Sequence, residues 1–172
     1  MSEPTTSAEP DLIAPISDGP DEASVSRVLD APRERVFAMW TDPAHVTHWW
    51  RPEGFRSVVC ERMDVRPGGG FEFRMHHENG NEYLSRNTYI EVVPPVRLVY
   101  DETCYENGTA FHQARMTIRF DDLGRRTRLI IHGHFTWLPG RDPRWTIDAM
   151  KAGWTGGWKD NLDLLVQYLA TL

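Results

Sequence analysis

The stretch "IDAMKAGWTGGWKDNLDLLVQYLATL", Ile147 to Leu172, predicts one long amphipathic helix at the end of the chain. Its large apolar residues recur at steps of three and four, which places them on one helical face: Ile147, Met150, Trp154, Trp158, Leu162, Leu165 and Leu169. Asp142-Pro143, a capping residue followed by a first-turn proline, predicts the start of this helix. Three glycines weaken the helix by about 0.5–1 kcal/mol each relative to alanine: Gly153, Gly156 and Gly157.

The chain before this helix has a period of two and is punctuated by turn residues. We expect strands at 24–30, 57–64, 70–77, 82–93, 96–103, 111–121 and 126–137. The links between the later strands are short and rich in glycine, proline or asparagine, such as "PGGG" from Pro67 to Gly70. Short links favour antiparallel neighbours, so the strands predict an antiparallel sheet.

Two short helices are expected between the first and second strands. Pro32 and Pro43 each mark the first turn of a predicted helix, a position that favours proline. The second helix should run to about Trp50. Neighbouring side chains on a helix point about 100° apart. We therefore expect Trp49 to line a pocket while Trp50 fills the core.

These elements together predict an α+β domain with a seven-stranded antiparallel sheet wrapped around the long helix. One face of such a sheet is apolar, and the helix is the obvious cover for it. A curved sheet leaves a space under the helix, which is a ligand cavity unless side chains fill it. We expect its walls to be these residues: Trp49, Phe71, Phe73, Tyr83, Tyr100, His112, Met150, Trp154 and Trp158.

Charge separates the chain into two parts. Residues 1–24 contain six acidic residues and no lysine or arginine, and the remainder is balanced. The sequence therefore predicts a disordered, acidic, proline-containing tail over residues 1–23 and one domain over residues 24–172. A neutral domain behind an acidic tail binds phosphate poorly, which argues against nucleic acid as a partner.

Apolar runs, the N-terminal residues and the cysteines indicate where in the cell the protein is located. No apolar run is long enough to span a membrane, and no secretory signal is visible at the N-terminus. Cys60 and Cys104 are far apart in the sequence and belong to no motif, so we expect free thiols in a reducing cytoplasm. A monomer or homodimer is expected.

Histidines offer the best candidates for a metal site. His132 and His134 lie on one face of a predicted strand, with His76, Cys104 and His112 on neighbouring strands. Leu129 and Ile131 fit the core face better, so the histidine pair should point away from the helix. No full set of ligand spacings is present, and we expect no metal, no cofactor and no catalytic residues.

Four segments resemble the helix-grip superfamily (START-like, SRPBCC), and within it relatives of the activator of the ninety-kilodalton heat-shock chaperone's ATPase. They are "APRERVFAMWTDPAHVTHWWRPEGF" from Ala31, "RPGGGFEFRM" from Arg66, "YIEVVPPVRLVY" from Tyr89 and "GWKDNLDLLVQYL" from Gly157. The resemblance implies a sheet that grips the C-terminal helix around an apolar cavity. Polyketide cyclases and lipid-transfer domains share this fold.

The leading functional hypothesis is a protein that binds a small hydrophobic molecule rather than an enzyme. One alternative is a stress-related interaction protein with a chaperone partner, which would stimulate a chaperone ATPase. Another is a cyclase or hydrolase acting on an aromatic substrate. The enzyme requires a titratable side chain deep in the cavity and facing the helix, and the sequence alone singles out none.

Overall fold

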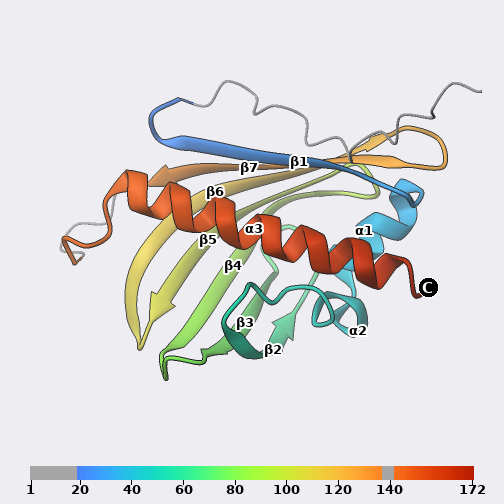
Figure 1. The fold of residues 1–172 in the computed structure, drawn as a ribbon. Coiled ribbons are helices and arrows are strands. Elements are labelled where there is room, and N and C mark those ends of the chain that lie inside the picture. The colour runs from blue at the N-terminus through green and yellow to red at the C-terminus, as the bar shows by residue number, and fades with distance from the viewer. Residues whose placement is uncertain (1–18, 137–141) are drawn as a thin grey trace, which may run out of the picture.

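The computed structural model describes residues 19–136 and 142–172 and has the predicted α+β architecture (Figure 1). One seven-stranded sheet has the order β1-β7-β6-β5-β4-β3-β2, and every neighbouring pair is antiparallel. The elements are β1 (Glu22–Leu29), α1 (Arg33–Thr41), α2 (Pro43–Val46), β2 (Phe55–Met63), β3 (Gly70–His77), β4 (Glu82–Val93), β5 (Arg97–Glu106), β6 (Thr109–Asp122), β7 (Thr127–Thr136) and α3 (Ile147–Leu169). The sheet curves around α3, and the two short helices lie near the C-terminal end of α3.

Alternation along the strands produces the buried face of the sheet. On β6, Ala114, Met116, Ile118 and Phe120 are buried, while Arg115 and Arg119 between them are exposed. The buried set faces α3, as the period of two requires. On β7, a Cβ at Gly133 would lie 3.2 Å from Cζ2 of Trp154, so glycine leaves room for α3 to pack closely.

The start of α3 differs from the sequence prediction. Thr146 is the N-cap, and its hydroxyl accepts a hydrogen bond from Ala149 N at 3.1 Å. Asp142 instead accepts from Arg144 N at 2.9 Å, in a turn before the helix. Asp142-Pro143 is therefore a turn signal, because the closer threonine satisfies the first free N–H groups of the helix.

The second short helix also differs, because it ends at Val46 rather than near Trp50. The chain then continues in a turn, in which Trp50 N donates to Val46 O at 3.0 Å, and Trp49 donates from Nε1 to Met39 O at 3.1 Å. Trp50 turns toward the sheet and packs on Trp158, with 4.9 Å between ring centroids. Both indoles are buried.

The start of the first strand, the two cysteines and the lengths of the helices can also be compared with the sequence predictions. β1 begins at Glu22, two residues before the expected start, and residues 1–18 of the predicted tail lie outside the described residues, as does Trp137. Cys60 and Cys104 are free thiols on β2 and β5. None of the helices that the structure describes is long and apolar enough to cross a membrane.

Candidate functional site

A cavity of about 330 Å³ lies between the sheet and the N-terminal half of α3. Its walls are mainly aromatic and come from the sheet, from α3 and from the segments that flank them: Trp50, Phe55, Tyr83, Phe111, Trp145, Trp154 and Trp158. Polar side chains of β4, β5 and β6 also line it: Ser85, Glu102, Cys104 and His112. A largely apolar pocket with a few convergent polar groups is typical of a site for a small molecule.

Five of the nine residues expected around the cavity line it: Tyr83, His112, Met150, Trp154 and Trp158. The other four lie in the core and do not line it: Trp49, Phe71, Phe73 and Tyr100, each at most 3% exposed. Trp50 lines the cavity instead of Trp49. Its ring centroid lies 4.9 Å from that of Phe73 and 6.0 Å from that of Phe71. Trp50 therefore separates these two residues from the cavity.

Glycines of α3 keep the helix side of the cavity open. Gly153 and Gly157 line it, and a Cβ at Gly153 would have no neighbouring atom within 4 Å. Gly156, on the same helix, also faces open space but does not line the cavity. The helix is therefore narrow where it passes over the cavity.

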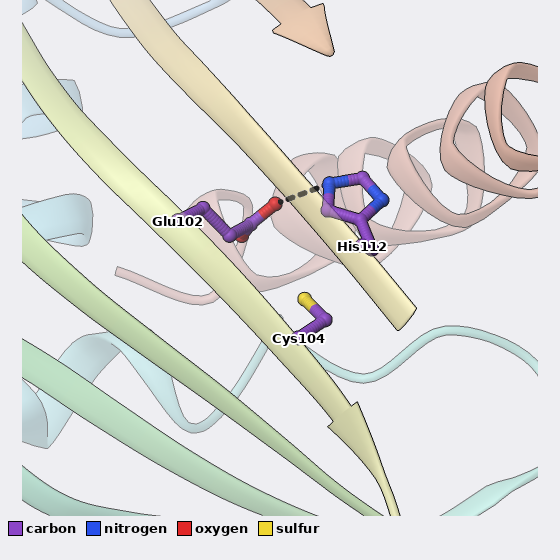
Figure 2. Close-up of side chains that lie close together, drawn as sticks. All are labelled: Glu102, Cys104 and His112. Carbon is purple, nitrogen blue, oxygen red and sulfur yellow. Dashed lines mark ion pairs between the residues drawn. The ribbon is translucent and has the colours of Figure 1, made fainter. Parts of the chain in front are cut away.

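Three chemically different side chains meet on the strand side of the cavity, and Figure 2 shows Glu102 and Cys104 on β5 with His112 on β6. Nε2 of His112 lies 3.1 Å from Oε1 of Glu102, and each side chain is only 7% exposed. One ligand atom from each of the three residues can be chosen so that all lie within 4.8 Å of one another. We call these three residues the Glu-Cys-His cluster.

Glu102 was not among the cavity residues predicted from the sequence, although the alternation of side chains along β5 indicates that it faces the core. It follows Leu98 and Tyr100 at a period of two on β5, and both of those residues are fully buried. A carboxylate in that phase must point to the same face. A buried acidic residue needs partners, and here these are His112 and the hydroxyl of Ser85, which donates to Oε2 at 3.4 Å.

A hydrogen-bonded chain from β4 supports the cluster. Nδ2 of Asn87 donates to Ser85 Oγ at 2.9 Å and to Phe71 O at 3.3 Å. Ser85 in turn donates to Glu102, so these side chains hold one oxygen of the carboxylate. The other oxygen faces His112.

The comparisons with known proteins decide the family. The model of the family described as "Activator of Hsp90 ATPase homolog 1-like protein" matches residues 30–170. The chain belongs to this family. A search of the curated proteins found no match.

Solved structures show the same fold as this AHSA1-family chain. A crystal structure of a Chromobacterium violaceum protein has a TM-score of 0.71 and 25% identity, over 87% of this chain and 96% of that one. A solution structure of an Arthrobacter aurescens protein has a TM-score of 0.77 and 19% identity, over 94% of each chain. A Mycobacterium smegmatis protein has a TM-score of 0.76 and 16% identity, over 92% of this chain and 97% of that one.

Burial controls the protonation of the cavity thiol in this AHSA1-family protein. Burial raises the pKa of Cys104 well above its usual value, the nearby Glu102 carboxylate raises it further, and a hydrogen bond with Ser85 opposes the shift. Burial also raises the pKa of Tyr83, whose hydroxyl donates to Glu106 Oε1 at 2.7 Å. Cys104 is therefore a neutral thiol at pH 7 and a weak nucleophile in that state.

Several polar atoms around the cavity are buried without a hydrogen-bond partner among the described residues. They are Nε1 of Trp154, Oδ1 of Asn161 and Nε2 of His112. Nε2 of His112 is close enough to Glu102 for an ion pair but lacks the direction of a hydrogen bond. Buried polar groups are normally hydrogen-bonded, so these atoms can form hydrogen bonds with polar atoms of a ligand.

The outer face of the sheet contains a different hollow of similar size, about 330 Å³, lined largely by polar side chains that include Asp101, Arg115 and His134. Arg115 already binds Asp101 there with two hydrogen bonds of 2.8 and 2.9 Å. His132, also on this face, lies 3.8 Å from Glu22 Oε1. The histidines of β7 thus lie away from Cys104 and His112, which face α3.

Proposed function

We propose that this AHSA1-family protein is a cytoplasmic binding protein for a small, largely apolar aromatic molecule. The cavity between the sheet and α3 is the site. The observation that carries the proposal is its composition, because aromatic walls surround one buried polar cluster. Its volume of about 330 Å³ is at the lower end of the range of roughly 300–1,000 Å³ usual for ligand pockets.

The polar cluster determines how such a molecule is oriented. An oxygen or nitrogen of the ligand faces Glu102 and His112, and its ring packs between Trp50 and Trp154. Asn161 on α3 and Nε1 of Trp154 supply a further acceptor and donor. An entirely aliphatic ligand leaves these groups unpaired and binds less tightly, because an unsatisfied buried polar group costs about 1–3 kcal/mol.

A second candidate is an enzyme acting on an aromatic substrate. The pair of His112 and Glu102 favours it, since a titratable group facing the helix is what such an enzyme requires. Turnover, unlike binding, would depend on His112 as a proton donor or acceptor. A chaperone partner is the third candidate, and stimulation of a chaperone ATPase by the purified protein tests it.

Native mass spectrometry with N-phenylnaphthylamine, an uncharged aromatic amine, tests the proposed binding. The parent protein should take up one molecule per chain. Gly153→Leu fills the cavity from α3 and should abolish uptake, whereas Gly156→Leu adds the same side chain outside the cavity and should retain it. No saturable uptake by the parent, or equal uptake by both variants, would refute a site in this cavity.

A further inference from the structure

We propose that the Glu-Cys-His cluster binds a Zn²⁺ ion through Glu102, Cys104 and His112, and that the fourth coordination position opens into the cavity. Thiolate, imidazole and carboxylate are the three ligand types that zinc binds in proteins. Three protein ligands with one open position are typical of zinc sites that act on or bind a further molecule.

The separations fit a tetrahedral ion after a small adjustment. Zinc–ligand distances of about 2.0–2.3 Å place tetrahedral ligand atoms roughly 3.3–3.6 Å apart. Nε2 of His112 and Oε1 of Glu102 are 3.1 Å apart, and no pair in the cluster exceeds 4.8 Å. Rotation of the Cys104 side chain, which borders the cavity, can supply the remaining movement.

The backbone positions of the ligands are well defined. Cys104 and His112 are directly paired across β5 and β6, and Glu102 is two residues earlier on the same face of β5. The His112 ring packs edge-on against Phe135, with 5.2 Å between centroids. Sites built on paired strands hold their ligands more precisely than sites on loops.

Side chains around the cluster fulfil the usual role of an outer coordination sphere. Ser85 binds Oε2 of Glu102, and Asn87 fixes Ser85, which leaves Oε1 to face His112. Nε2 of His112 is buried, makes no directed hydrogen bond among the described residues, and faces Oε1. A ring nitrogen in this state is available as a metal ligand.

Charge and protons balance in the binding step. Zn²⁺ forms bonds to the Cys104 sulfur, a Glu102 oxygen and Nε2 of neutral His112, and the thiol proton is released to the buffer. The two negative ligands offset the charge of the ion in a site that is largely shielded from water. All three proposed ligands come from the protein, so metal binding can be measured without the aromatic ligand.

The test uses the full chain, reduced and freed of metal with a chelator. Titration with Co²⁺, whose spectrum reports thiolate ligands, should show one ion per chain with a thiolate-to-cobalt absorption band, and Zn²⁺ should displace it. Cys104→Ser should eliminate the band. His112→Gln and Glu102→Gln should weaken binding by more than the roughly 10–100-fold cost of losing an outer-sphere partner.

Cys60→Ser is the matched control, because Cys60 lies on β2 and outside the cavity. This variant should bind Co²⁺ as the parent does. No thiolate band in the parent, or an unchanged band in Cys104→Ser, would overturn the proposal. Uptake of N-phenylnaphthylamine measured in the presence of chelator separates this failure from failure of the proposed binding function.

A second measurement avoids dependence on the folding of any variant. Zn²⁺ should slow the alkylation of Cys104 by iodoacetamide in the parent protein, while the rate at Cys60 stays unchanged. Peptide mass mapping distinguishes the two cysteines. Equal rates at Cys104 with and without Zn²⁺ would contradict the proposed site.

Discussion

Cys104 of β5 and His112 of β6 are directly paired across the sheet, and both side chains line the cavity beneath α3. The register of the two strands shifts immediately after this pair, between Cys104 and Tyr105. Such irregularities redirect side chains and often lie beside functional sites. The polar part of the cavity thus lies next to an irregularity in the pairing of β5 and β6, whose register is otherwise regular.

The buried thiol predicts a fall in stability at alkaline pH. An unfolded cysteine titrates near pH 8.5, and burial raises the pKa of Cys104 in the folded protein. Above pH 8.5 the unfolded state therefore loses its proton first, and the free energy of unfolding falls by up to about 1.4 kcal/mol per pH unit. Urea unfolding at pH 7.5 and 9.5, with chelator present, measures this fall.

Cys104→Ser should remove the contribution of this thiol and show a smaller fall between the two pH values. Cys60 is present in both proteins, so its own raised pKa cancels in the comparison. An equal fall in the parent and in Cys104→Ser would show that Cys104 titrates alike in the folded and unfolded states.

The two tryptophans Trp49 and Trp154 should differ in their effect on stability. Trp49 is fully buried and hydrogen-bonded to Met39, so Trp49→Ala should cost at least the roughly 3–5 kcal/mol of a core truncation. Trp154→Ala should cost clearly less, because Trp154 already borders an open cavity. Urea unfolding of the two variants checks this order, and equal costs would mean that Trp154 is ordinary core.

Replacing either of two glycines of α3 with alanine should raise stability, but only one of the two substitutions should weaken ligand binding. Gly153→Ala and Gly156→Ala should each stabilise the protein by about 0.5–1 kcal/mol, because both positions are helical and have open space around them. Only Gly153→Ala adds a methyl group to the cavity wall, and only it should weaken binding of N-phenylnaphthylamine. Equal binding by both variants would place the probe elsewhere.

The sheet and α3 could be predicted because their signals are periodic and long. The strand expected at 82–93 has those bounds in the structure, and the apolar steps from Ile147 to Leu169 match the observed helix. The end of α2 could not be predicted from its own residues. The hydrogen bond from Trp49 to Met39, just beyond that helix, is a tertiary contact that the local sequence does not reveal.

The candidate site was predictable only in part, for a related reason. Periodicity places Phe71 and Phe73 on the inward face, but it carries no information on which inward residues another side chain covers. Trp50 covers them, and this depends on the path of the chain after α2. Glu102 and His112 converge through strand register, which no local spacing reveals.

The most direct test of the proposed cavity site is methionine-methyl NMR during titration with N-phenylnaphthylamine. Met75 and Met150 line the cavity, whereas Met39 is buried in the core and Met63 lies on β2, both away from it. The account predicts saturable shifts and ligand contacts at Met75 and Met150, with Met39 and Met63 unchanged. Shifts confined to Met39 or Met63, or no saturable shift at any methionine, would contradict it.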